Sequence, residues 1–90
     1  MGYLREMWSL ELSREAVKAL LRMPRPEAVR IRRHLDQLAQ DPWTTPNVKK
    51  LTDHPGFRLR VGDWRIVYLL KEQQLIVQVI RIARRGEVYR

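Results

Sequence analysis

The chain has 90 residues, with 18 Lys and Arg against 10 Asp and Glu, so its formal charge is +8. This length fits one domain, residues 1–90, and 44% hydrophobic residues suffice for a modest core. The absence of cysteine excludes disulfides and thiolate zinc sites. The chain shows neither the apolar region of a signal peptide nor the stretch of about 20 apolar residues that spans a bilayer, so we expect a cytoplasmic protein without a membrane partner.

The positive charge is concentrated in the second half of the chain. Residues 1–45 hold eight Lys and Arg against six Asp and Glu, whereas residues 46–90 hold ten against four. A field of this sign attracts nucleic acid, an anionic membrane surface or an acidic protein. A basic excess on a small protein also serves solubility alone, so the placement of the charges decides between these interpretations.

The first 40 residues predict a strand followed by two helices. Residues 7–12 alternate in the manner of a strand with one buried face. Ser13 occupies the position of a helix N-cap, and apolar residues recur at helical spacing up to Pro24, which disfavours helix in the residue before it. A second helix begins at Pro26 and keeps one apolar stripe to about Gln40. The short proline loop between them predicts an antiparallel helical hairpin.

The remaining residues predict a loop and a β-meander. Residues 41–56 contain three prolines and a glycine, which is typical of a loop, with a short extended piece at 48–51. Three strand-like runs follow at 57–61, 64–70 and 75–82, and a two-residue link suited to a tight hairpin joins the first two. We therefore predict an α+β fold in which an N-terminal strand and an antiparallel helical hairpin pack on a small antiparallel β-sheet.

Arginines interrupt the strands of this predicted sheet. Because side chains alternate along a strand, Arg58 and Arg60 face away from the apolar residues around them, which are expected to pack on the helices. Arg65 follows the hairpin turn, where strand pairing brings it close to the other two. Clustered like charges repel one another unless an anion lies between them, and a guanidinium group matches phosphate geometry. The pattern therefore predicts a binding site for a nucleic-acid phosphate.

The C-terminal sequence and the preceding loop extend this prediction. The sequence ARRGEVYR adds three basic side chains and a phenol, namely Arg84, Arg85, Tyr89 and Arg90. If the chain turns back after the last strand, these side chains meet the strand arginines on one concave surface. Lys49 and Lys50 either reach RNA from the loop or are ordinary surface charges. Two separated histidines and scattered carboxylates offer no common metal-ligand spacing, so no metal or cofactor is expected.

The segments KKL, GFRLRVGDWRIVYLL and VIRIARRGEVY resemble the RelE superfamily of bacterial and archaeal type II toxins. The resemblance extends over essentially the whole chain, because the strand and helical hairpin occur in that family in the same order. It implies a RelE-like, microbial-ribonuclease-like fold. It also implies a metal-independent, ribosome-dependent endoribonuclease that cleaves mRNA in the A site and inhibits translation. A cognate antitoxin would hold it inactive and link it indirectly to operator DNA.

The resemblance also assigns roles to individual residues. The implied catalytic residues are Arg58, Arg60, Arg65, Arg85 and Tyr89. The implied RNA-binding residues are Lys49, Lys50, Arg84 and Arg90. Arginine replaces two catalytic lysines of the best known relatives at positions 58 and 60, and Arg84 stands where many relatives have histidine. Because a guanidinium group with a pKa above about 12 is no base near neutrality, Tyr89 either stacks on a base or handles a proton.

Two other functions are compatible with the same residues. ParE toxins share the fold and inhibit DNA gyrase through a protein interface. A catalytically degenerate toxin would bind only its antitoxin and nucleic acid. Neither histidine is expected to act in the site, since His34 is expected on an exposed helix surface and His54 lies in the proline loop.

Overall fold

Two helices and five strands make up the described part of the computed structural model, which covers residues 7–87. In chain order they are β1 (Ser9–Leu12), α1 (Arg14–Arg22), α2 (Arg25–Gln40), β2 (Val48–Lys50), β3 (Phe57–Val61), β4 (Trp64–Lys71) and β5 (Ile76–Arg84). The predicted order and type of these elements are confirmed, with ends that differ by one or two residues.

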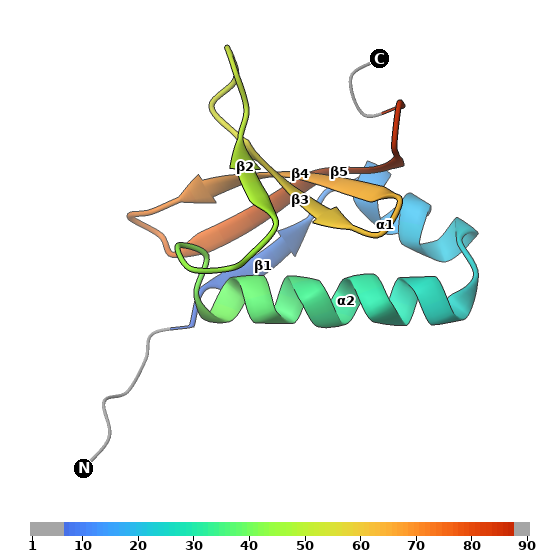
Figure 1. Cartoon of the computed structure of the whole chain (residues 1–90). Helices are drawn as coiled ribbons and strands as arrows, with labels where there is room; N and C mark the ends of the chain where they lie inside the picture. The colour runs from blue at the N-terminus through green and yellow to red at the C-terminus, as the bar shows by residue number, and fades with distance from the viewer. Residues whose placement is uncertain (1–6, 88–90) are drawn as a thin grey trace.

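The five strands form one sheet in the order β1-β5-β4-β3-β2 (Figure 1). Neighbours from β2 to β5 run antiparallel, while β1 pairs with β5 in parallel. The helices carry the chain from β1 across the sheet to its far edge, and the meander then returns to β5. The predicted α+β fold is confirmed, and the sheet is mixed because the meander ends beside the first strand in the same direction.

Residues at the helix ends explain where α1 and α2 begin and stop. Ser13 Oγ accepts a hydrogen bond from the Ala16 N–H at 3.0 Å and donates one to the Ile80 carbonyl at 2.9 Å. Ser13 therefore caps α1 and ties its first turn to β5. Met23 is extended, with ψ of 161°, as expected for a residue before a proline. That kink separates the two helices.

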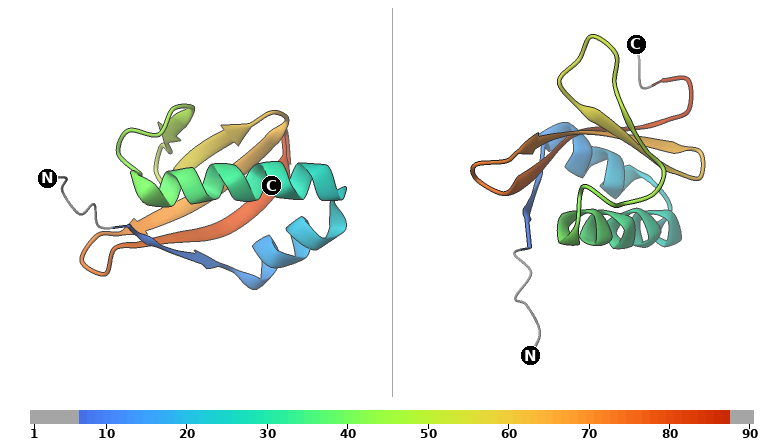
Figure 2. Two further views of the ribbon diagram at one scale, coloured as in Figure 1. Left: turned by 90° about the horizontal axis from the view of Figure 1, so that it is seen from below. Right: turned by 60° about the vertical axis from the view of Figure 1, so that its left-hand side comes forward.

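The hydrophobic core lies between the helices and one face of the sheet, which we call the covered face (Figure 2). The sheet contributes Leu59, Val61, Ile66, Tyr68, Val77, Val79 and Ile82, and the helices contribute Ala16, Ile31, Leu35 and Leu38. All are buried. Figure 2 shows both helices on the same side of the sheet, so the opposite side, which we call the open face, is not covered by a helix of residues 7–87.

Tyr68 is the polar exception in this core. Its ring stacks on Phe57 with centroids 5.6 Å apart, and it is fully buried. Its hydroxyl has no hydrogen-bond partner among the described residues. Burial raises the pKa of this hydroxyl well above its ordinary range, because the anionic form would be desolvated.

Among the described residues, a small apolar cluster lies on the open face. Val67 and Ala83 are buried there, with Leu51 and Ile80 packed against them. The open face is therefore the surface on which charged strand residues gather.

Neither helix among residues 7–87 is long and apolar enough to cross a bilayer.

Candidate nucleic-acid interface

The arginines of β3 and β4 lie on the open face of the sheet. Leu59 is buried against the helices, so Arg58 and Arg60 on either side of it face the other way. In the antiparallel register Arg60 pairs with Arg65, and Arg58 pairs with Val67. Paired residues of neighbouring strands share a face. The structure thus brings Arg58, Arg60 and Arg65 onto one face, as the strand pattern predicts.

Arg60 and Arg65 lie at the hairpin end of this face, and both guanidinium groups bind the nearby chain. Arg60 Nη2 donates to Asn47 Oδ1 at 3.0 Å. Arg65 Nη1 donates to the carbonyl oxygens of Gly62 at 2.9 Å and Trp64 at 3.1 Å. These bonds orient the two side chains, so an incoming anion meets guanidinium groups that are already held in place.

Arg85 lies beside the same hairpin turn. Its backbone N–H donates to the Asp63 carbonyl at 2.7 Å, and the residue is exposed. Gly86 follows with φ of 90°, a left-handed conformation that favours glycine, and there the chain leaves the strand. The structure therefore brings Arg85 to the end of the sheet that holds Arg60 and Arg65.

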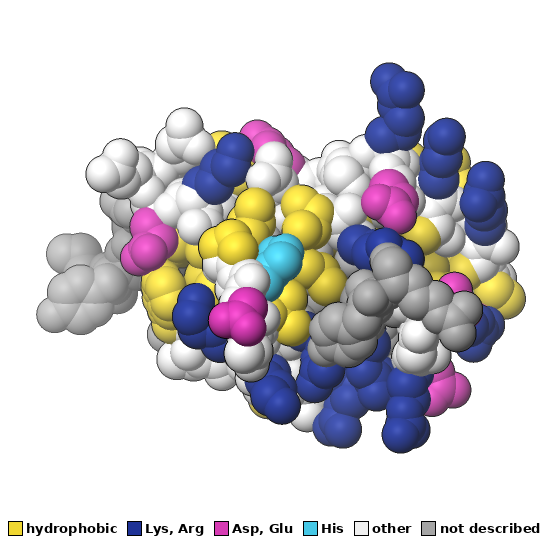
Figure 3. Space-filling view, turned by 90° about the horizontal axis from the view of Figure 1, so that it is seen from above, with side chains coloured by type: hydrophobic (Ala, Val, Ile, Leu, Met, Phe, Trp, Pro, Cys, Tyr) yellow, Lys and Arg dark blue, Asp and Glu magenta, His cyan; other side chains and the backbone are white. Residues whose placement is uncertain are grey.

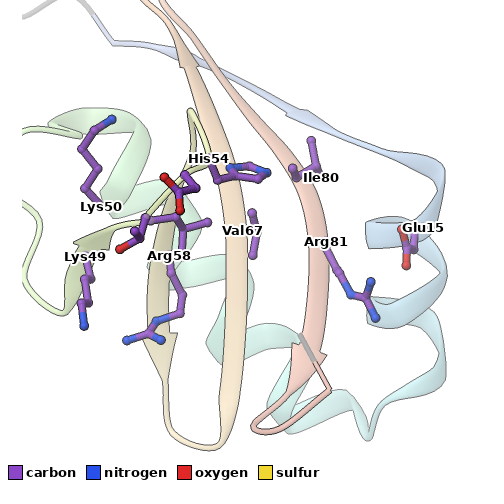
Figure 4. Close-up of a pocket in the computed structure, with 11 residues that line it drawn as sticks. Glu15, Lys49, Lys50, His54, Arg58, Val67, Ile80 and Arg81 are labelled. Carbon is purple, nitrogen blue, oxygen red and sulfur yellow. The ribbon is translucent and has the colours of Figure 1, made fainter. Parts of the chain in front are cut away.

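A hollow of about 750 Å³ opens on the open face, farther along β3, β4 and β5 from the hairpin turn (Figure 4). Figure 3 shows apolar side chains and a histidine on this face, with Lys and Arg side chains around them. Val67 and Ile80, two members of the small apolar cluster, line it. Lys49 and Arg58 extend in the same direction along one wall, and Arg81 extends along the opposite side (Figure 4). We call this feature the basic hollow.

Arg81 is the residue of this site that the sequence analysis misses. It pairs with Val67 on β4, which in turn pairs with Arg58 on β3, so Arg58 and Arg81 flank Val67. Arg81 Nη2 donates to the Glu87 carbonyl at 3.1 Å. Alternation along β5 from the buried Val77 and Val79 would place Arg81 on the covered face, and the register shift opposite Val67 and Tyr68 turns it to the open face.

His54, for which the sequence predicts no active-site role, also lines the basic hollow. It belongs to the loop between β2 and β3, and its ring lies over β4 near Val67 and Ile80 (Figure 4). Its Nδ1 accepts a hydrogen bond from the Gly56 N–H at 2.8 Å. The sequence gives no indication of this position, because the path of the loop is set by contacts with the sheet.

Lys50 and Arg84 contact aromatic rings, and Lys50 also lines the basic hollow. Lys50 Nζ lies 4.8 Å from the centre of the Phe57 ring. Arg84 Cζ lies 4.7 Å from the centre of the Trp64 ring, whose Nε1 donates to Glu27 Oε1 of α2. Arg84 is therefore on the helix side of the sheet, and the expectation that it converges with Arg58 is wrong. The register shift of β5 opposite Val67 and Tyr68 explains this placement, because the extra residue of the bulge turns Arg84 to the face that Val77 and Val79 share.

The last two predicted site residues, Tyr89 and Arg90, lie outside the described residues. Within residues 7–87 the basic hollow also contains two carboxylates, Glu15 and Asp53, against the cationic side chains on its walls. In this described part no group of three or more His, Asp or Glu side chains is arranged to hold a metal ion. The arrangement can bind an anion and relieve its charge through arginine and lysine.

The family model for the ParE toxin of the type II toxin–antitoxin system parDE matches residues 10–89. Because this match spans most of the chain, the protein belongs to that family, within the RelE/ParE superfamily of type II toxins.

Solved structures of toxin–antitoxin complexes share the fold. The archaeal RelE–RelB complex from Pyrococcus horikoshii has a TM-score of 0.79 at 23% identity, covering 92% of this chain and 100% of that one. RelBE2 from Mycobacterium tuberculosis gives 0.78 at 18% identity, covering 89% and 100%. The intact RelBE complex of E. coli gives 0.74 at 19% identity, covering 89% and 98%. No curated protein sequence matches the chain significantly.

Proposed function

We propose that this toxin is a metal-independent, ribosome-dependent endoribonuclease that cleaves mRNA in the ribosomal A site and thereby inhibits translation in the cytoplasm. The observation that carries the proposal is the open face, where Arg58 and Arg81 flank an apolar floor and Arg60 pairs with Arg65. Apolar and aromatic surfaces take bases, and guanidinium groups take the phosphates between them. The shared fold with RelE toxins agrees with this assignment.

The main contribution that the arginines of this face can make to the reaction is to stabilise the negative charge that develops on the phosphate. The ribose 2′-OH attacks the adjacent phosphorus, the P–O2′ bond forms and the P–O5′ bond breaks. The 2′-OH proton goes to an acceptor, and the departing 5′ oxygen takes up a proton. Arginines such as Arg58, Arg60, Arg65 and Arg85 would stabilise the extra negative charge of the phosphorane. Tyr89 is proposed to stack on a base or to handle one of the two protons.

Dependence on the ribosome follows from what arginine cannot do. A guanidinium group does not accept a proton near neutrality, and general acid–base catalysis contributes about 10² to 10⁴-fold in typical enzymes. A site without a strong base needs its substrate held in the in-line geometry by another body. A codon fixed in the A site supplies this alignment, with Lys49, Lys50, Arg84 and Arg90 proposed to contact RNA around it.

A cognate antitoxin is the proposed protein partner. The similar structures from P. horikoshii, M. tuberculosis and E. coli are complexes of a RelE toxin with its RelB antitoxin. An acidic or amphipathic antitoxin segment would complement the charge of the open face. Contact with operator DNA would then be indirect, through the antitoxin.

Inhibition of DNA gyrase is the second candidate function, because the family that matches the chain is that of ParE toxins. In this case the exposed arginines would contact gyrase, and no RNA would be cut. The prediction for this alternative is a supercoiling defect and DNA damage signalling while translation is initially normal.

One experiment separates these functions. Purified toxin is incubated with mRNA in the presence and absence of programmed ribosomes, and primer extension maps new 5′ ends. We expect cuts at the A-site codon with ribosomes and few or none on free RNA. A gyrase supercoiling assay runs in parallel on the same preparation. Inhibited supercoiling with intact mRNA would replace the ribonuclease proposal, and inactivity in both assays would indicate a degenerate toxin.

Two variants test the site assignment in the same assay. Arg58→Ala removes a guanidinium group from the basic hollow, and we expect cleavage to fall at least tenfold. Arg33→Ala makes the same change of charge on an exposed position of α2, on the covered side of the sheet, and should cleave like the unchanged protein. Equal cleavage by both variants would place the reaction elsewhere on the molecule.

A further inference from the structure

His54 is a side chain of the basic hollow to which no role has yet been given. Its imidazole lies over β4 between the Arg58 side and the Ile80 side of the hollow (Figure 4). The chain has one other histidine, His34, on α2. The contacts around His54 define both the position of its ring and the nitrogen that carries its proton.

The loop that carries His54 is held at both ends. The Leu51 N–H donates to the Gly56 carbonyl at 3.1 Å, which closes the loop where β2 ends and β3 begins. Asp53 takes a left-handed conformation, with φ of 56°, next to the histidine. The Gly56 N–H then donates to His54 Nδ1 at 2.8 Å. The ring is therefore fixed to the loop that presents it.

Gly56 fits only as glycine in this arrangement. It is buried, and a Cβ atom there would lie 2.8 Å from the Tyr68 carbonyl oxygen and 2.8 Å from His54 Cε1. The first contact is with β4 backbone, which cannot yield as a side chain does. The Nδ1 and Cε1 edge of the imidazole is thus packed on Gly56, and the edge that bears Nε2 points away from Gly56.

The hydrogen bond from Gly56 also fixes the tautomer of the ring. A backbone N–H donates, so Nδ1 must accept and holds no proton. In the neutral imidazole the proton then resides on Nε2. His54 Nε2 is accordingly a hydrogen-bond donor in this state, and it is not a proton acceptor.

A neutral donor suits a site that is already rich in cations. The four cations that line the same hollow, Lys49, Lys50, Arg58 and Arg81, outnumber its two carboxylates, Glu15 and Asp53, so a further positive charge would add net like-charge repulsion. An Nε2–H group adds a directed hydrogen bond to an anion without that repulsion. The short link to the Gly56 backbone means that little side-chain freedom is lost on binding.

We propose that His54 is a substrate-binding residue of the basic hollow, where its neutral imidazole donates Nε2–H to a phosphate oxygen of single-stranded RNA. This inference rests on the proposed function for the identity of the substrate. It assigns His54 to binding and orientation, and it leaves acceptance of the 2′-OH proton to another group.

The test uses variants that separate the two ring nitrogens. His54→Asn keeps an acceptor near the position of Nδ1 for the Gly56 N–H and removes the donor at Nε2. His54→Gln places an amide N–H₂ near the position of Nε2. The probe is a short 2′-O-methyl RNA, which cannot be cut because it lacks the attacking hydroxyl. Its affinity is measured by fluorescence anisotropy at fixed salt concentration.

We expect His54→Asn to bind the probe about tenfold more weakly and His54→Gln to recover part of the loss. His34→Asn is the matched control on α2 and should bind normally. Thermal unfolding of each variant checks that the fold is intact. If His54→Asn binds the probe as tightly as the unchanged protein, the proposal is overturned.

Nitrogen NMR of the histidine side chains supplies a second readout that needs no activity. In the free protein His54 should show a protonated Nε2 and an unprotonated Nδ1, and the Nε2 signal should shift when the 2′-O-methyl RNA is added. A protonated Nδ1, or an Nε2 signal that does not shift when the RNA is added, would overturn the proposal. Gly56→Ala should displace the ring and reproduce the loss of affinity.

These readouts distinguish failure of the inference from failure of the proposed function. If the toxin does not cut mRNA on ribosomes but His54→Asn still weakens RNA binding, His54 is correctly assigned and only the cleavage proposal fails. If mRNA is cut normally and His54→Asn changes neither binding nor cleavage, the ribonuclease proposal stands and the role of His54 is wrong.

Discussion

The two faces of the sheet are built from the same strands and have opposite surroundings. On the covered face Leu59, Ile66 and Val79 are fully or almost fully buried beneath the helices. On the open face their neighbours Arg58, Arg60 and Arg65 flank or approach a hollow exposed to solvent.

This contrast separates stability from function. Burial of apolar area provides most of the free energy of folding, about 25 cal/mol for each Å² removed from water, and it is concentrated on the covered face. The open face carries the small cluster around Val67 and Ala83. Substitutions on the covered face should therefore change stability, whereas those on the open face should change RNA binding.

The largest effect on stability should come from placing a charged side chain at a buried position of β3, compared with placing an apolar one at the adjacent exposed position. Leu59→Arg places a charge in the core without a partner, and we expect the free energy of unfolding to fall by about 4 kcal/mol or more, enough to unfold the chain. Arg60→Leu, one residue along, loses one exposed hydrogen bond and should change stability by about 1 kcal/mol or less. Urea denaturation followed by circular dichroism measures both. Similar losses in the two variants would contradict the contrast between the faces.

A tenfold effect is expected in RNA binding when cations are removed from the basic hollow. Arg58→Ala and Lys49→Ala should each weaken binding of single-stranded RNA about tenfold and reduce the slope of log affinity against log salt by about 0.7. Binding isotherms at several salt concentrations give the slope. Arg33→Ala on α2 is the control, because it removes one positive charge away from the open face. If all three variants shift the slope equally, the attraction comes from net charge and not from the open face.

A smaller effect should follow from loosening the junction between α1 and β5 on the covered side. Ser13→Ala removes the cap of α1 and the hydrogen bond to the Ile80 carbonyl, so stability should fall by about 1 to 2 kcal/mol. Ser9→Ala, at an exposed position of β1, is the control and should leave stability nearly unchanged. RNA binding should be nearly unchanged in both variants, and a tenfold loss in Ser13→Ala would show that the junction also shapes the hollow.

The smallest effect concerns Tyr68 at alkaline pH. Its pKa in the folded chain is raised above the ordinary value of 10.0, so the unfolded chain loses this proton first. The stabilisation linked to Tyr68 is fully present below pH 10 and declines as the pH rises further. Between pH 10 and 11 it should decline by about 1 kcal/mol. Tyr68→Phe should remove that part of the decline in denaturation curves at each pH, and an unaltered decline would contradict the assignment.

The sequence by itself predicts much of this architecture. Local signals such as the Ser13 cap, the extended residue before Pro24 and the two-residue hairpin link act within a few residues. They can therefore be recognised in the sequence without knowledge of the fold. The strand period likewise places Arg58 and Arg60 on one side and Leu59 on the other. The same rule does not place Arg81 and Arg84, because the register of β5 shifts opposite Val67 and Tyr68 and the residues after this bulge change faces.

The tertiary structure decided how distant segments meet. The parallel pairing of β1 with β5 and the closure of the loop that presents His54 depend on contacts between residues far apart in the chain. Such contacts are selected by packing against the whole sheet, and short-range patterns carry no record of them. The amino-acid sequence therefore determined which residues alternate across the sheet, and only the folded chain determined which of them share the basic hollow.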